Sequence, residues 1–138
     1  MNTIYITEDM FKSGQPVAQG EVLIWMKKYA PAALLAGIAN LKMSEMALEN
    51  GQMILGHSES GHHHVLEPVA KSVPISKAAL ALIDSANDTF VELKLNETCA
   101  LVHMRGHDTH GTFVFPAGEY IRGLREEQAP EGWRRVAD

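Results

Sequence analysis

Cysteine is almost absent from this sequence, since Cys99 is the single one among 138 residues. One cysteine cannot close a disulfide within the chain, whereas small secreted domains usually carry an even set. The N-terminal residues also lack the basic start and the long apolar run of a signal peptide, and Glu8 and Asp9 lie there instead. We therefore expect a protein of a reducing compartment, the cytoplasm.

Basic residues are also fewer than acidic ones. The chain has 12 Lys and Arg against 17 Asp and Glu, which gives a formal net charge of -5. This is the wrong sign for a protein whose main task is to grip a phosphate backbone. The composition predicts no nucleic-acid partner.

No apolar stretch is long enough to cross a bilayer as a helix. The most apolar one, residues 30–41, is interrupted by Pro31, Gly37 and Asn40, and a spanning helix needs about 20 apolar residues. Hydrophobic residues nevertheless make up 46% of the chain, which is enough for one buried core. We expect one β-rich domain over residues 1–138, with a polar tail at about 126–138 and no membrane partner.

Familiar catalytic signatures are missing too. The chain has no Walker A loop, no G-x-G-x-x-G, no H-E-x-x-H and no G-x-S-x-G. Cys99 and His103 are four residues apart, which is about 13 Å on a strand and beyond hydrogen-bond reach. A Cys–His catalytic pair within this segment is excluded on that geometry.

The pattern of the chain is mostly that of short strands separated by glycine, proline and asparagine, which indicates a mainly β fold, a barrel or a β-sandwich with one or two short helices. Single strands are expected at residues 3–7, 17–26, 89–95 and 120–124. Ser76 as an N-cap predicts a helix over residues 76–86. Residues 32–39 fit either a short helix or a buried loop.

Two further pairs of strands resemble each other. Residues 52–56 and 62–67 predict one hairpin, and residues 98–104 and 110–115 predict a second. Each pair encloses a five-residue loop that contains a glycine, which can adopt a positive φ.

The sequence is rich in histidine at both hairpins, and its seven histidines form two clusters, residues 57–64 and 103–110. His62 and His64 are two residues apart, so on a strand their side chains leave the same face with Cα atoms about 7 Å apart. His63 then leaves the opposite face and is set aside. His110, at the start of a strand, is the predicted third metal ligand.

The remaining histidines and the choice of metal stay open. His57, His103 and His107 are held in reserve as ligands. Three neutral imidazoles suit zinc, iron, nickel or copper and leave a coordination position for water or a small molecule. The competing interpretation is that the histidines are hydrogen-bonded polar residues at one rim of a β domain.

Gly56, five residues and then His62-x-His64 resemble the first half of the first cupin motif. The glutamate of that motif has a poor match, because Glu67 follows His64 after two residues only. Gly111, four residues and then a Pro-x-Gly turn at 116–118 resemble part of the second motif, although Ile121 stands where that motif has its histidine.

The resemblance implies a cupin-like double-stranded β-helix barrel. Cupins typically hold a metal on three histidines and a glutamate, and they range from dioxygenases and isomerases to non-catalytic binding proteins. Residues 60–64, His110 and residues 116–120 also resemble small bacterial and phage proteins with an S/T-G-H-x-H motif, a family with no assigned activity.

Two functions follow from these observations. The first is a metal-binding, cupin-like protein that is a candidate metalloenzyme acting on a small-molecule ligand. In this case Tyr120, Arg122 and Glu127 are candidates for the wall of its pocket. The same three residues also fit ordinary surface positions on a strand. The second is a non-enzymatic structural or interaction module, of a phage-associated kind, with residues 133–135 as a contact segment. With either function we expect a homodimer, because two copies can pair through their open sheet edges.

Overall fold

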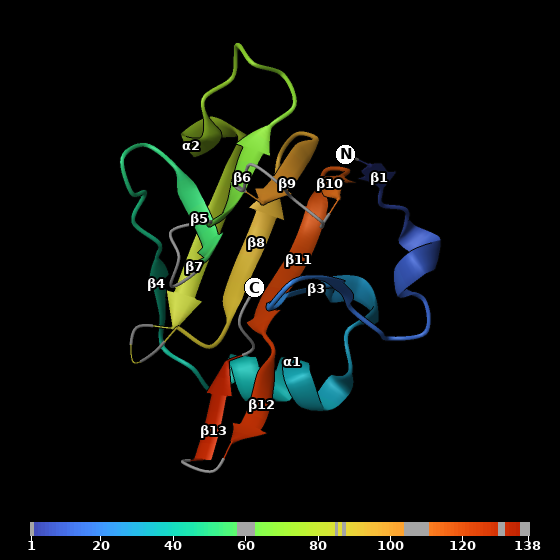
Figure 1. Cartoon of the computed structure of the whole chain (residues 1–138), viewed down its shortest axis with the longest axis vertical. Helices are drawn as coiled ribbons and strands as arrows, with labels where there is room; N and C mark the ends of the chain where they lie inside the picture. Colours follow the sequence, from blue (N-terminus) through green and yellow to red (C-terminus); the bar gives the residue numbers. More distant parts are fainter. Residues whose placement is uncertain are drawn as a thin grey trace.

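The computed structural model describes residues 2–57, 63–84, 86, 88–103, 111–129 and 132–135, with the backbone alone for 126–129 and 132–135. In these ranges the chain forms a five-stranded sheet, a six-stranded sheet and a separate two-stranded sheet (Figure 1). The expectation of a mainly β fold is confirmed. Within the described residues the two large sheets do not close into one barrel.

The five-stranded sheet has the order β1-β10-β9-β6-β5. Its strands are β1 (Thr3–Tyr5), β10 (Thr112–Phe115), β9 (Cys99–His103), β6 (His64–Pro68) and β5 (Met53–Gly56). β1 is parallel to β10, and the other neighbours are antiparallel.

The six-stranded sheet has the order β2-β3-β11-β8-β7-β4. Its strands are β2 (Val17–Gln19), β3 (Val22–Met26), β11 (Gly118–Leu124), β8 (Val91–Leu95), β7 (Ala79–Asp84) and β4 (Met43–Glu45). All its neighbouring strands are antiparallel.

The core lies between these two sheets. In β8, Val91, Leu93 and Leu95 are buried while Glu92 and Lys94 between them are less so, as the period of two predicts. One hydrophobic cluster joins inward side chains of both sheets, and it includes Val22, Ile24, Leu55, Leu66, Val91, Leu93, Leu101, Phe115 and Tyr120.

Both predicted hairpins are present. β5 pairs with β6, and β9 pairs with β10. β6 also pairs with β9, which the sequence pattern does not predict. The two hairpins are therefore neighbours in one sheet.

The predicted helix over residues 76–86 is wrong beyond its first turn. Helix α2 covers Ile75–Ala78 and strand β7 follows at once as Ala79–Asp84. Ala79 and Ala81 are buried in the core, and β7 pairs with both β8 and β4. Pairing on both sides and burial of alternate residues outweigh the helix propensity of this alanine- and leucine-rich segment.

The other helices are short. They are α1 (Ala32–Ala39) and the 3₁₀ turns η1 (Glu8–Phe11) and η2 (Lys27–Tyr29). The open choice over residues 32–39 is thus resolved as a helix. None of the helices in the described ranges has both the length and the apolar character needed to span a membrane.

The expected polar tail contains a hairpin. β12 (Glu126–Ala129) pairs with β13 (Gly132–Arg135), and the pair extends away from the two large sheets (Figure 1). The predicted strand at residues 17–26 is also two strands, because Gly20 at φ 56° turns β2 into β3.

Candidate functional site around His64

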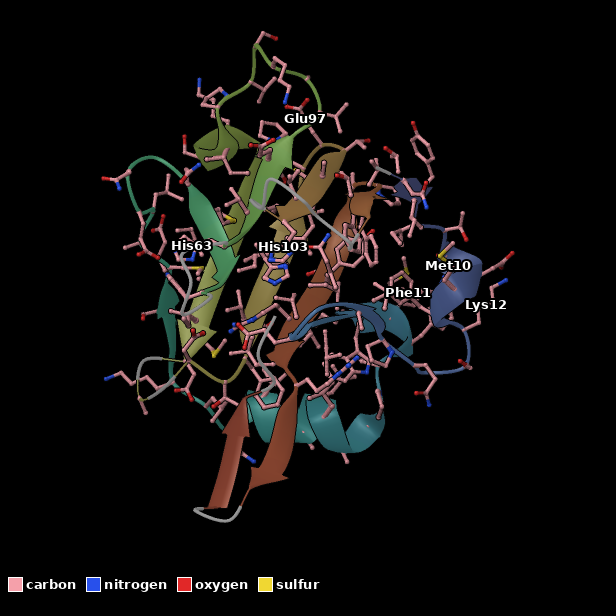
Figure 2. The ribbon with its side chains drawn as sticks, in the orientation of Figure 1. Met10, Phe11, Lys12, His63, Glu97 and His103 are labelled. Carbon is pink, nitrogen blue, oxygen red and sulfur yellow. The ribbon has the colours of Figure 1, made fainter. Side chains whose placement is uncertain are left out.

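The two histidine clusters meet at one place in the fold. His64 is the first residue of β6 and His103 is the last residue of β9, and the two are paired in register. Their rings are stacked, with centroids 4.3 Å apart and planes at 5°. Both side chains face the core, with 0% and 2% exposure, and His103 lies in the middle of the molecule (Figure 2).

A glutamine from the other sheet holds His64. Gln19 ends β2, is 1% exposed, and its Oε1 lies 2.7 Å from Nδ1 of His64. Its Nε2 donates to the backbone oxygens of Leu101, at 3.0 Å, and of Gly111, at 2.8 Å. One amide therefore links β2 to β6, to β9 and to the residue before β10.

Glycine at position 56 lets β5 pass close to the His64 ring. Gly56 is paired with His64 across the sheet. A Cβ added there would lie 2.6 Å from Cγ2 of Val22 and 3.0 Å from Cδ2 of His64. The ring of His64 thus sits between His103 and the backbone of Gly56, with Nδ1 directed at Gln19. We call Gln19, Gly56, His64 and His103 the His64 site.

The hydrogen bonds determine where the proton sits on His64. A carbonyl oxygen only accepts, so the amide nitrogen of Gln19 must face Leu101 and Gly111, and its Oε1 must face His64. Nδ1 of His64 is then the donor. In the neutral ring the lone pair lies on Nε2, which is the arrangement typical of a histidine metal ligand.

This geometry fits a metal on His64 but not one shared by both stacked rings. An imidazole binds an ion in the plane of its ring, along the lone pair. Because the planes of His64 and His103 are nearly parallel and 4.3 Å apart at their centroids, one ion cannot lie in both planes. Other ligands would have to come from the neighbouring segments.

Those segments contain the other two predicted ligands. His62 and His110, and also His107 in reserve, lie outside the described residues. Among the residues that are described, no group of three or more His, Cys, Asp and Glu side chains is suited to a metal ion. The predicted set of His62, His64 and His110 therefore stays a prediction.

Two histidines of the first cluster lie away from the core. Nε2 of His57 is 2.5 Å from Oε2 of Glu49, and both side chains are well exposed. The ring of His63 packs edge-on against that of His57, with centroids 5.2 Å apart, and lies at the side of the molecule in Figure 2. The expectation that His63 and His64 differ in direction agrees with this arrangement.

Glu67, the poor match to the cupin glutamate, does not face the His64 site. It alternates with the inward Leu66 on β6 and forms an ion pair with Lys71, at 3.7 Å. Both line a groove of about 280 Å³ together with Pro68 and Val73, toward the other end of β6. None of the histidines that the structure describes lines this groove.

Tyr120 and Arg122, the candidates for a pocket wall, are buried on the inner face of β11. The hydroxyl of Tyr120 donates to the backbone oxygen of Pro116 at 2.7 Å, and burial raises the pKa of Tyr120 to about 12. Arg122 donates to the backbone oxygen of Leu55 at 3.1 Å and to Asp88 at 2.6 Å. The third candidate, Glu127, is described only as part of the β12 backbone.

Cys99 is a buried residue of the core. Burial, with a smaller contribution from the charge of Glu97, raises the pKa of its thiol to about 11. It stands at the opposite end of β9 from His103, as the spacing predicts. A thiol with this pKa is protonated near neutral pH and is a poor nucleophile.

Sequence patterns missed Gln19 and the role of Gly56. Gln19 is 45 positions from His64 along the chain, and a lone glutamine next to a glycine is typical of a turn. Comparison with protein-family models, with curated proteins and with solved structures finds no match to this chain.

Proposed function

We propose that this protein binds a divalent transition metal, with His64 as its buried ligand and His62 and His110 as the other two protein ligands. The observation that carries the proposal is the hydrogen bond between Nδ1 of His64 and Gln19. With Nδ1 donating to Gln19, Nε2 is the ring nitrogen through which His64 would bind an ion. Zinc, iron, nickel and copper all accept such a nitrogen.

Chain connectivity supports the choice of the other two ligands. Two residues of extended chain span at most about 7 Å, so His62 cannot be far from His64. His110 immediately precedes Gly111, whose backbone oxygen is bonded to the same glutamine that holds His64. His57, His103 and His107 remain in reserve, and the stacking described above argues against His103.

The proposal extends to the cupin-like character of the site. Gly56 and His64, two residues of the first motif, are paired on adjacent strands with their backbone and ring in close approach. Three imidazole ligands leave a position at which a metal can polarise a small molecule or activate water. A metalloprotein that acts on a small molecule is therefore the function that we favour.

Location and assembly complete the proposal. A cytoplasmic location is supported by the single buried thiol, Cys99. A homodimer through a sheet edge is supported by the ends of the two large sheets, where β1, β5, β2 and β4 each have one neighbour among the described strands.

Elemental analysis of untagged protein, purified without chelators or a nickel column, tests the metal proposal. We expect about one ion per chain in the parent protein and in His63→Ala, the matched control. His62→Ala and His110→Ala should each retain far less metal. Parent protein without metal after incubation with zinc, iron, nickel and copper salts, or equal losses in His63→Ala and His62→Ala, would contradict it.

A further inference from the structure

Gln19 is placed to act on the proposed metal site through its hydrogen bond to His64. It is the last residue of β2 in the six-stranded sheet, paired in register with Val22. Its side chain crosses to the five-stranded sheet, where it makes the contacts with Leu101 and Gly111. A glutamine this deeply buried is uncommon, and its amide satisfies three separate hydrogen-bonding groups.

Each contact of this amide constrains a different part of the site. The bond to His64 selects one tautomer of the ring. The bond to Gly111 fixes the backbone next to His110, and the bond to Leu101 fixes β9 two residues before His103. The donors and the acceptor cannot exchange places, because both carbonyl partners are acceptors only.

We infer that Gln19 is a positioning residue that holds His64 in the Nδ1–H tautomer and thereby sets the metal affinity of the site. This inference rests on the proposed function for its second half. Partners of this kind, which hydrogen-bond the remote nitrogen of a histidine ligand, typically change metal affinity by about 10- to 100-fold when they are lost. We expect a loss of metal affinity of the same size when Gln19 is replaced by a residue that cannot bond His64.

Two substitutions separate the acceptor of Gln19 from its donors. Gln19→Met has a similar length and removes all three hydrogen bonds. Gln19→Glu retains an acceptor for Nδ1 of His64 but loses the donors to Leu101 and Gly111. Gln52→Met makes the same change at an exposed glutamine and is the matched control.

The first readout is the tautomer, measured by ¹⁵N NMR of the histidine rings in metal-free protein. The parent protein and Gln52→Met should give a protonated Nδ1 and an unprotonated Nε2 for His64, and Gln19→Glu should keep the proton on Nδ1. Gln19→Met should lose this preference. A parent protein with the proton on Nε2, or no change in Gln19→Met, would overturn the inference.

The second readout is the dissociation constant for Zn²⁺, measured by competition with a chromophoric chelator. Gln19→Met should bind Zn²⁺ about 10- to 100-fold more weakly than the parent, with Gln19→Glu closer to the parent and Gln52→Met unchanged. Equal affinities in the parent and in a folded Gln19→Met would overturn the inference while leaving the metal proposal in place. No Zn²⁺ binding by the parent would refute the metal proposal and the affinity effect together, whereas the NMR result would still decide the role of Gln19 in the tautomer. Backbone amide spectra of each variant show whether it is folded.

Discussion

The ring of His64 lies flat on the ring of His103, one from each of the two histidine clusters, in a pair that joins β6 to β9. This contact brings together segments almost 40 residues apart in sequence. The two residues nevertheless differ. The ring of His64 is bonded to Gln19 and has a defined tautomer, and one ion cannot lie in both of the nearly parallel ring planes.

Replacement of either stacked residue by phenylalanine tests that distinction. His103→Phe keeps a flat ring against His64 and should bind Zn²⁺ as the parent does, because His103 is not a ligand in this arrangement. His64→Phe should abolish binding. The measurement is the same chelator competition, and an equal loss in both variants would mean that the rings separate to bind the ion together.

Gly56→Ala is expected to destabilise the protein by about 1–3 kcal/mol, because its Cβ would overpack Val22 and His64. Gly37→Ala in α1 is the control, since its Cβ would meet nothing within 4 Å, and it should stabilise the helix by about 0.5–1 kcal/mol. Urea unfolding measures both. A Gly56→Ala variant as stable as the parent would contradict the close packing of Gly56 against Val22 and His64.

The ion pair between the buried Arg122 and the partly exposed Asp88 makes an asymmetric prediction. The side chain of Arg122 is 1% exposed and that of Asp88 is 38% exposed. Asp88→Ala leaves a buried guanidinium without this carboxylate and should cost about 3 kcal/mol, whereas Arg122→Met leaves an aspartate that water can reach and should cost less. Asp9→Ala breaks an exposed pair with Lys12 and should leave the urea midpoint unchanged. The reverse order of the first two variants would contradict the burial argument.

Stability should fall at alkaline pH. Burial raises the pKa of Cys99 from 9.0 to about 11 and that of Tyr120 from 10.0 to about 12. Between these values the unfolded chain has released protons that the folded chain still holds, so the free energy of unfolding decreases as the pH rises. Below pH 9 this contribution is fully present.

Cys99→Ala separates this effect from the titration of exposed groups. Urea unfolding between pH 8 and pH 11 should show a shallower decline in the variant than in the parent, because the variant lacks the buried thiol. Parallel curves for the two proteins would contradict the assignment to Cys99.

Local pattern predicts the strands and hairpins of this protein well, because alternation along β8 and glycine in the loops are properties of neighbouring residues. It fails at residues 76–86, where β7 is held by pairing with β8 and β4, which the local composition does not contain. The contribution of Gln19 is out of reach for the same reason, since its partners come from three other strands or their ends. Histidine spacing alone does indicate which residues to test.

The central claim is that Nε2 of His64 binds a metal ion, and anomalous diffraction tests it most directly. Crystals of the protein grown with Zn²⁺ and measured on both sides of the zinc edge should give an anomalous peak about 2.0–2.1 Å from Nε2 of His64, with Nδ1 still bonded to Gln19. A peak only at other residues, or one bound through Nδ1 of His64, would contradict the account.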